Sequence, residues 1–546
     1  MSLNHPQTAS TPRRVDAVVI GAGFAGLYAV YKLREMGLSH AAFEQGGGVG
    51  GTWYWNRYPG ARCDVESLEY SYSFSDELQQ EWEWPERFAA QADILRYANH
   101  VADRFDLRRD IRFKTRVKSA VYDPASCHWR ITTDRGDIVD ARFCVMASGN
   151  LSLPRVPDFK GLEAFKGKWY HTGQWPHEPV DFTGQRVGVI GTGSSGIQLI
   201  PVVAQQASHL HVFQRTANFS VPAVNRPLTK QQEEAYKREY RLHREEALRT
   251  PFGIGGHPPP QKYAHEDTEE ARSESFEKKW HTGGNISFLY AYKDLLTNQQ
   301  ANETACAFVR DKIRQTVKNP EVAQWLMPDD HPIGTKRLCL DTGYYETFNR
   351  DNVTLVNIRK DPISEMTATG IRTARNTYEL DAVIFATGYD AMTGAMLDID
   401  IRIAGGESLQ DKWAAGPRTY LGLVTAGFPN LLIITGPGSP SVKANMIAAI
   451  EQHVDWIRDL MAYVQAGGYQ QVDADTEAEE KWVAHVNQVA DSTLYPLANS
   501  WYLGANIPGK PRVFMPYVAG LDKYRAICDD VAANAYRGLT LAKSAS

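Results

Sequence analysis

Two short glycine-rich segments of the chain have the spacing that brings backbone N–H groups close to phosphates. They are Gly21-Ala-Gly23-Phe-Ala-Gly26 and Gly191-Thr-Gly193-Ser-Ser-Gly196. In this pattern the first two glycines let the backbone approach a pyrophosphate, and the third lets a helix pack closely on a strand. The unpaired N–H groups at the start of that helix bind phosphate oxygens. Each segment therefore predicts a dinucleotide-binding site.

The residues on either side of the glycines predict the elements that position them. Apolar runs at 15–20 and 185–190 come directly before the two loops and read as buried parallel strands. Apolar residues at helical spacing follow each loop, and strand, loop, helix is the context that makes the motif specific. Two further apolar strands, at 143–149 and 382–388, should return the chain between domains. The sequence thus predicts an α/β fold with two Rossmann-like domains.

The residues 23 positions after each first glycine distinguish the two nucleotides. At the first site this residue is Glu44, whose carboxylate can accept hydrogen bonds from ribose hydroxyls. At the second it is Gln214, followed by Arg215 and Thr216. A guanidinium pairs with a 2′-phosphate, which a carboxylate would repel. The second site should therefore prefer NADPH to NADH.

The segment 50–64 indicates that the first nucleotide is FAD rather than NAD. It joins a second glycine-rich turn to several aromatic residues, which suits a ring that needs walls as well as phosphate contacts. Asp64 lies among these aromatics, where a carboxylate requires a cationic partner. Alternatively, Asp64 caps a helix over 65–70. The combination of sites is that of a flavoprotein reduced by NADPH.

Length, charge and cysteine usage limit the remaining possibilities. A chain of 546 residues should form two or three domains. The net charge of −5 argues against nucleic acid as a partner. The six cysteines include no Cys-x-x-Cys pair, which disfavours a flavin–disulfide reductase and a metal site. With no signal peptide and no membrane-length apolar run, we expect a cytoplasmic protein with a small-molecule substrate and a monomeric state.

The stretch Phe165–Pro176 lies between the two sites and carries a more specific pattern. Its residues read F-x-G-x-x-x-H-x-x-x-W-P, and the chain resembles the type I Baeyer–Villiger monooxygenases from Val15 to about Gly538. The resemblance is strongest to the phenylacetone and steroid monooxygenase branch. The segments that carry it are 336–337, 419–422, 436–440 and 500–506.

The resemblance implies a reaction. In this family NADPH reduces FAD, O₂ forms a C4a-peroxyflavin, and that species attacks a ketone. The resulting Criegee intermediate collapses to an ester or lactone. An N- or S-oxygenating flavin-containing monooxygenase is the alternative, but it would not be expected to carry Trp175-Pro176 or an arginine at 337. A flavoprotein that only leaks peroxide needs nothing beyond the two glycine loops.

The resemblance also implies residue roles. Arg337 matches the active-site arginine and Asp64 the acid that orients it, which suits a reaction through oxygen anions because arginine keeps its proton. Implied FAD-binding residues are Gly21, Gly23, Phe24, Gly26, Glu44, Gly51, Thr52, Trp53, Asp64, Tyr70, Val117 and Met446. Implied NADP-binding residues are Thr192, Gly193, Ser194, Ser195, Gly196, Gln198, Arg215, Thr216, Lys336, Arg337 and Trp501, the last on a mobile loop.

Within the linking stretch, the family pattern rests on Phe165, Gly167, His171, Trp175 and Pro176. His171 has the chemistry of a catalytic base, but its family role is that of a hinge and hydrogen-bond anchor, and we favour the structural role.

The expected domain organisation follows from the positions of the loops and return strands. A flexible tail at 1–14 should precede an FAD-binding domain at 15–152 and 386–546. The NADP-binding domain should take 153–224 and 330–385, with a helical insertion at 225–329. In that insertion and beyond it, helices are expected at Glu233–Arg249, Ala301–Val317 and Lys443–Val464. The last should begin beside the flavin, where Met446 either contacts the ring or is plain core.

Overall fold

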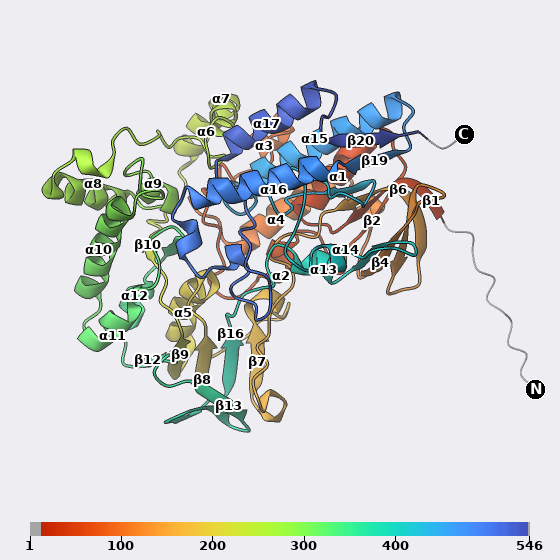
Figure 1. Cartoon of the computed structure of the whole chain (residues 1–546). Coiled ribbons are helices and arrows are strands. Elements are labelled where there is room, and N and C mark those ends of the chain that lie inside the picture. Colours follow the sequence, from red (N-terminus) through yellow and green to blue (C-terminus); the bar gives the residue numbers. More distant parts are fainter. Residues whose placement is uncertain (1–12, 544–546) are drawn as a thin grey trace, which may run out of the picture.

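The computed structural model describes residues 13–543, in which two main sheets are separate from each other (Figure 1). The larger sheet has the order β17-β4-β5-β6-β1-β2-β3, with β18 also paired to β6. Its strands are β1 (Arg13–Ile20), β2 (His40–Phe43), β3 (Ile111–Arg112), β4 (Val117–Asp123), β5 (His128–Thr133), β6 (Ile138–Met146), β17 (Asp400–Ile403) and β18 (Leu431–Ile433).

The smaller sheet is fully parallel and has the order β12-β9-β8-β16-β7. Its strands are β7 (Lys168–His171), β8 (Arg186–Ile190), β9 (His209–Gln214), β12 (Val353–Asn357) and β16 (Ala382–Phe385). Short strands β10 (Ser220–Pro222), β11 (Cys339–Asp341), β13 (Ile363–Thr367), β14 (Gly370–Thr373), β15 (Thr377–Glu379), β19 (Gln471–Ala474) and β20 (Leu539–Ala542) form three minor sheets.

Helices cover the sheets. Those before residue 300 are α1 (Phe24–Glu35), α2 (Thr52–Trp55), α3 (Asp76–Glu81), α4 (Gln91–Arg104), α5 (Ser194–Gln206), α6 (Lys230–Arg238), α7 (Tyr240–Ala247), α8 (Glu269–Thr282), α9 (Asn285–Leu289) and α10 (Gln299–Thr316). The later ones are α11 (Pro320–Leu326), α12 (Tyr344–Thr347), α13 (Gly394–Leu397), α14 (Leu409–Lys412), α15 (Met446–Ala466), α16 (Thr476–Asp491) and α17 (Leu521–Ala533).

The two nucleotide loops are built in the same way. Gly21 has a φ of +108° and Gly191 a φ of +110°, in the range that favours glycine. A Cβ atom at Gly21 would lie 2.4 Å from the carbonyl oxygen of Ala147, and one at Gly191 equally close to that of Ala386. Each loop therefore packs directly against the return strand of its own sheet, β6 or β16. The predicted fold class, with two Rossmann-like domains, is confirmed.

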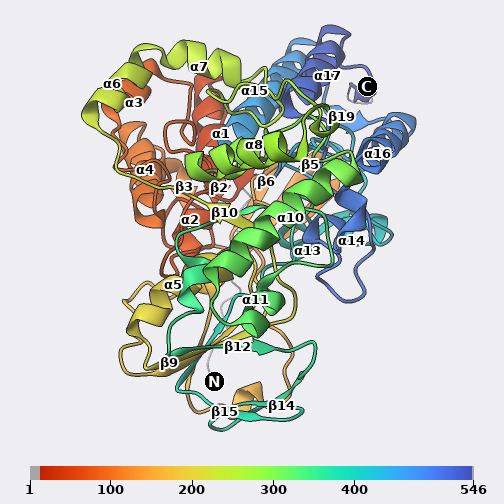
Figure 2. The ribbon, with the colours of Figure 1, turned by 90° about the vertical axis from the view of Figure 1, so that its left-hand side faces the viewer.

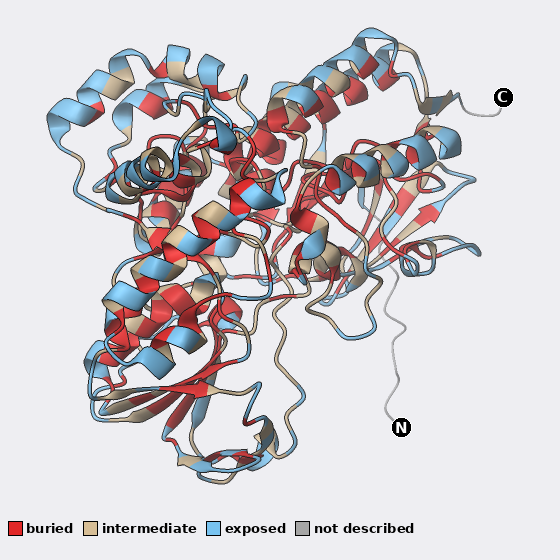
Figure 3. Ribbon diagram, turned by 60° about the vertical axis from the view of Figure 1, so that its left-hand side comes forward, coloured by how far each residue is buried: buried red, intermediate tan, exposed pale blue. Residues whose placement is uncertain are grey.

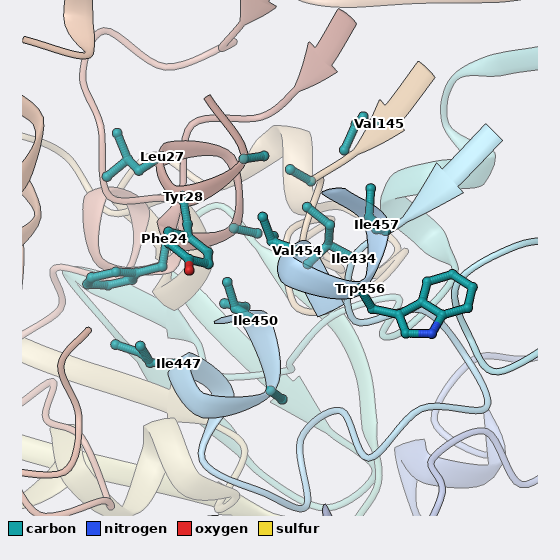
Figure 4. Packing of buried hydrophobic residues seen from close by; sticks show 14 of the residues in the cluster. Phe24, Leu27, Tyr28, Val145, Ile434, Ile447, Ile450, Val454, Trp456 and Ile457 are labelled. Atoms are coloured by element: carbon teal, nitrogen blue, oxygen red, sulfur yellow. The ribbon is translucent and has the colours of Figure 1, made fainter. Parts of the chain in front are cut away.

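Helix α15 packs against α1 to form the centre of the larger core. Figure 4 shows Phe24, Leu27 and Tyr28 of α1 facing Ile447, Ile450 and Val454 of α15. The helix begins at Met446 rather than at the expected Lys443. The side chain of Asn445 caps it by accepting a hydrogen bond from the N–H of Ile447 at 3.1 Å. Residues 443–445 are left as a loop.

The remaining expectations for local structure are partly corrected. The charged segment Glu233–Arg249 forms two helices, α6 and α7, because the chain bends at Glu239. The expected helix Ala301–Val317 is found as α10, with one face buried and the opposite face exposed (Figure 3). Figure 2 shows α8 and α10 lying on the face turned toward the viewer. Residues 65–70 form turns instead of the helix that Asp64 would have capped.

The N-terminal boundary also moves. The expected tail, 1–14, lies outside the described residues except for Arg13 and Arg14, which pair with β6 and so begin β1. Among residues 13–543, no helix combines the length and apolar character needed to cross a membrane.

Candidate active site

A cavity of about 370 Å³ lies beside the larger sheet, and its lining includes the first glycine-rich loop, at 21–26, and the glycine-rich turn at Gly50 and Gly51. Ten of the twelve residues expected to bind the first nucleotide line it: Gly21, Gly23, Phe24, Glu44, Gly51, Thr52, Trp53, Tyr70, Val117 and Met446. Gly26 lies beneath the loop, where a Cβ atom would stand 1.9 Å from the carbonyl oxygen of Gly21. Asp64 lies behind the wall of the cavity and reaches the site through its partner, described below.

The buried carboxylate of Glu44 binds the first glycine-rich loop at Ala22 and the start of the next turn at Gly46. Its Oε2 accepts a hydrogen bond from the N–H of Ala22 at 2.7 Å, and its Oε1 accepts one from the N–H of Gly46 at 2.6 Å. Burial raises the pKa of Glu44, and these two hydrogen bonds oppose the rise. The carboxylate therefore stands at the end of β2 beside the loop, in the position expected for a ribose ligand.

The cavity has further walls. Residues 148–154 line it from the segment that follows β6, and the sequence indicates the loop around Leu151–Leu153 as shaping the pocket. This segment stands at the carboxyl end of a parallel strand, where ligands bind. Asp398 and Ile399, between α13 and β17, also line the cavity and were missed, since they belong to no motif.

The second glycine loop stands at the start of α5, and its polar side chains already have protein partners. Thr192 donates its hydroxyl hydrogen bond to the carbonyl of Thr216 at 2.9 Å, and Ser194 Oγ lies 3.1 Å from Cys339 Sγ. Backbone N–H groups of Gly193, Ser195 and Gly196 at the helix start remain the phosphate-binding feature expected of the loop.

Gln198 joins α5 to the first nucleotide domain. Its side-chain oxygen accepts a hydrogen bond from the Tyr58 hydroxyl at 2.9 Å, and its amide nitrogen donates to the carbonyl of Arg62 at 2.9 Å. The resemblance gave Gln198 as an NADP ligand, whereas here its amide bonds the two domains together.

The cations expected at the second nucleotide gather at one place. Arg215 is exposed at the end of β9, beside Thr216, and its charge acts on the half-buried Lys336. Burial lowers the pKa of Lys336, and Asp330, whose Oδ2 lies 3.6 Å from Lys336 Nζ, opposes that effect. Arg359 also contacts Asp330, at 3.1 Å. Arg359 and Asp330 were missed, since neither belongs to a motif.

Asp64 and Arg337, which are 273 positions apart in the sequence, form a bidentate ion pair. Arg337 donates from Nε to Asp64 Oδ2 and from Nη2 to Asp64 Oδ1, both at 2.7 Å. Burial would raise the pKa of Asp64, but the adjacent guanidinium overcomes this and holds it below the usual range. Arg337 stays charged, since the ion pair raises its own pKa against the effect of burial.

The third contact of Arg337 ties the ion pair to the cavity. Its Nη1 donates to the carbonyl oxygen of Val442 at 2.7 Å, and Val442 lines the cavity beside Met446. The charges of Asp64 and Arg337 both act on the pKa of Tyr70, another lining residue. The side chain of Arg337 is still 27% exposed and that of Asp64 24% exposed, so the pair is partly open to a ligand.

The loop that carries Trp501 is attached to the chain that links the domains. Trp501 begins the short 3₁₀ helix η6 (Trp501–Leu503), with its ring centroid 4.3 Å from that of Tyr502. Further along the loop, the side chain of Asn506 donates to the carbonyl of Tyr389 at 2.8 Å. Trp501 is half-buried, and its contact with NADP stays a prediction.

The two interdomain crossings of the chain pair with each other next to His171. Pro154 and Tyr389 form an antiparallel bridge, and the N–H of Arg155 donates to the carbonyl of Gly388 at 3.0 Å. Each crossing is therefore held by the other at the edge of the cavity.

His171, at the end of β7, is almost fully buried beside these crossings. Its Nδ1 accepts a hydrogen bond from the N–H of Gly173 at 3.0 Å, so the neutral ring carries its proton on Nε2, 3.3 Å from Thr387 Oγ1. Burial lowers the pKa of His171 to about 4. Of the other pattern residues, Gly167 lies against the carbonyl of Asp381 and the ring of Phe165, and Trp175 packs against Tyr170 and Phe182.

A pH dependence follows for His171. Its folded-state pKa lies below the ordinary value of about 6.5, so the unfolded chain binds the extra proton between about pH 6.5 and 4. As the pH is lowered from about 6.5 to about 4, we expect the thermal midpoint of unfolding to fall. It should fall less steeply in His171→Asn, whose side-chain oxygen can still accept a hydrogen bond from the N–H of Gly173. Differential scanning fluorimetry against pH measures this. An equal slope in both proteins, or loss of FAD from His171→Asn, would contradict the anchoring role.

Comparison with known proteins agrees with this geometry. The flavin-binding monooxygenase-like family model matches residues 13–227. A solved structure of an oxidised steroid monooxygenase bound to NADP has 52% sequence identity and a TM-score of 0.92, over 97% of this chain and 100% of that one. A Baeyer–Villiger monooxygenase of Pseudooceanicola batsensis is 42% identical over 548 residues, 99% of this chain and 98% of its own.

A third relative extends the same result. Cyclohexanone 1,2-monooxygenase of Acinetobacter sp is 41% identical over 531 residues, 96% of each chain. Full-length similarity at this level, together with the Asp64–Arg337 pair at the cavity, shows that the chain belongs to the Baeyer–Villiger monooxygenases of the flavin-binding monooxygenase-like family.

Proposed function

We propose that this FAD- and NADPH-dependent monooxygenase converts ketones to esters or lactones, with Arg337 as the catalytic cation and Asp64 as its positioning residue. One observation carries the assignment. Arg337 is held by both oxygens of Asp64 and by the Val442 carbonyl, and is still 27% exposed beside the cavity. A fixed cation at that place suits a reaction in which negative charge develops on oxygen.

The residues present fit the two cofactors. The cradle formed by the glycine loops and Glu44 suits the pyrophosphate and ribose of FAD, and Trp53, Tyr70, Val117 and Met446 supply apolar walls for its ring. When bound, FAD and NADPH supply the electrons and the oxygen-transferring group of the reaction. The chain itself must position the ketone, exclude water and stabilise charge.

Arg337 meets these requirements through its three hydrogen bonds. Nε and Nη2 each donate one hydrogen bond to Asp64, and Nη1 donates one to the carbonyl of Val442. The plane of the guanidinium is therefore fixed before a substrate arrives. Because the cation is preorganised, no rearrangement is needed as an oxygen becomes negative. The remaining N–H groups of Nη1 and Nη2 are the donors that we assign to that oxygen and to bound NADP.

For the second nucleotide, we assign the 2′-phosphate to Arg215, Thr216 and Lys336. Their support is the convergence of two cations at the end of β9. We expect Arg215→Ala to raise the KM for NADPH roughly 10- to 100-fold, as loss of one charge-assisted contact predicts. The KM for NADH should change little. Steady-state kinetics with both coenzymes measures this, and equal losses for the two would refute the assignment.

Arg359→Ala serves as the matched control. Arg359 contacts Asp330 but was not assigned to the phosphate, so its removal should affect the NADPH preference less than removal of Arg215. A wild-type protein with comparable kcat/KM for NADH and NADPH would overturn the 2′-phosphate site altogether.

We propose the domain division expected from the sequence, except that the FAD-binding domain begins with β1 at Arg13 instead of at 15: FAD-binding at 13–152 and 386–546, NADP-binding at 153–224 and 330–385, and a helical insertion at 225–329. It is supported by the two sheets, which share no strand among the described residues. The bridge between Pro154 and Tyr389 falls next to both proposed crossings.

The function is tested by a panel of aryl, cyclic and linear ketones, with ester or lactone measured against NADPH consumed. We expect at least one class of ketone to give oxygenated product close to stoichiometric with NADPH. A sulfide and an amine belong in the same panel. Oxygenation of these without any ester from ketones would favour an N- or S-oxygenating enzyme, and NADPH use accounted for by peroxide alone would refute oxygen transfer.

A further inference from the structure

A second cavity, of about 190 Å³, has Lys443 in its lining, the residue that follows Val442 of the flavin cavity. Its walls come from the Pro- and Gly-rich segment after α7, from the segment between α9 and α10, and from residues 493–520. Phe252, Tyr290, Leu296, Lys443, Tyr495 and Tyr517 are among its lining residues. Most of its lining side chains are thus aromatic or aliphatic, and the exceptions are two lysines, two threonines and a glycine.

Lys443 is the unusual member of this lining. Its ammonium lies 4.1 Å from the ring centroid of Tyr495 and 4.8 Å from that of Tyr502. Among residues 13–543, no carboxylate lies within 4 Å of it. A lysine placed between two aromatic faces is stabilised by cation–π attraction, but it keeps three N–H donors that require an acceptor.

A bound anion would favour the charged form of Lys443, which its surroundings disfavour. Burial lowers the pKa of Lys443 well below its ordinary value, and the nearby positive charge of Arg337 lowers it further, while Asp64 opposes them. Asp64 is already occupied by Arg337. The exposed Lys293 adds a second cation to the cavity lining. Asp522 acts on Tyr290 and Tyr517 but is not among the lining residues.

The positions of Val442 and Lys443 connect the two cavities. Val442 lines the flavin cavity and binds Arg337 through its carbonyl, while Lys443 lines the second cavity. The charges of Arg337 and Asp64 both act on Lys443, so its side chain lies near the ion pair. A substrate with its carbonyl at Arg337 can therefore place a second group beside Lys443.

We propose that Lys443 forms a subsite for the carboxylate of an oxo acid whose ketone is oxygenated at Arg337. This inference rests on the proposed function and adds a substrate class to it. The carboxylate would accept hydrogen bonds from the ammonium of Lys443, and the aromatic walls would cover the carbon chain that joins it to the ketone.

The test compares each of a series of methyl-ketone carboxylic acids with its own methyl ester, in wild type, Lys443→Met and Lys443→Arg. The measured quantity is the ratio of kcat/KM for the acid to kcat/KM for the ester. We expect this ratio to fall roughly 10- to 100-fold in Lys443→Met, as loss of a charged hydrogen-bond partner predicts. The change should appear mainly in KM, and Lys443→Arg should restore part of it.

Lys230→Met is the matched control, because Lys230 on α6 has 83% of its side chain exposed and lines neither cavity. The ratio should keep its wild-type value there, and flavin content reports whether each variant folds. An unchanged ratio in Lys443→Met, with the esters still oxygenated, would overturn the subsite and leave the proposed function intact. If wild type oxygenates neither acid nor ester and only makes peroxide, the proposed function itself fails.

Discussion

Arg337→Ala is expected to lose ester formation by roughly a hundred- to a thousandfold in kcat, the effect of removing one preorganised donor from a developing oxygen anion. The loss is expected because, among residues 13–543, Arg337 is the cation that Asp64 and Val442 hold beside the cavity. NADPH should still be consumed, with hydrogen peroxide in place of ester. Ester by gas chromatography and peroxide by a coupled assay measure the two products.

Arg337→Lys is the informative companion. Lysine keeps a charge but cannot contact both oxygens of Asp64 and the Val442 carbonyl in one plane. We expect partial activity with poorer yield of ester per NADPH. An Arg337→Ala enzyme that still makes ester at the wild-type rate would remove the catalytic role from this residue.

Asp64→Ala is expected to lower stability as well as rate. It leaves the charged Arg337, whose side chain is only 27% exposed, without its partner. Breaking a buried ion pair costs about 3–5 kcal/mol, and the partial exposure places the expected cost near about 3 kcal/mol. The thermal midpoint of FAD release, followed by flavin fluorescence, should fall accordingly, and kcat for ester should fall with it because Arg337 is no longer held in place.

The double variant Asp64→Ala/Arg337→Met separates the two effects. Removing both charges eliminates the uncompensated guanidinium, so the midpoint of FAD release should recover much of the loss. Ester formation should stay absent. A double variant no more stable than Asp64→Ala would show that the ion pair is not the source of the destabilisation.

The nucleotide loops could be predicted from sequence because their requirements are local. The turn at Gly21, the helix after it and the carboxylate of Glu44 all follow from short-range backbone constraints, and the structure places ten of the expected residues around one cavity. Helix α10 was predicted for the same reason, since its apolar spacing reports directly on the face that is buried.

What sequence could not supply is the meeting of distant segments. Nothing in the residues near Asp64 indicates a partner 273 positions away, and only the family resemblance suggested Arg337. The carbonyl of Val442 is invisible in a sequence because every residue has one. The start of α15 was misplaced by three residues, since helical spacing does not reveal that Asn445 caps the helix. Lys443 was passed over as part of that helix.

The contact of Gln198 with Tyr58 and Arg62 limits how far this enzyme can be treated as modular. Helix α5, which begins at the second glycine-rich loop, is hydrogen-bonded through that side chain to residues 58–62 of the flavin unit. The two Rossmann units are therefore in direct contact there. A chimaera that exchanges the coenzyme unit for that of a relative must also take residues 58–62 from that relative. Otherwise the hydrogen bonds between the two units at Gln198 will not form correctly.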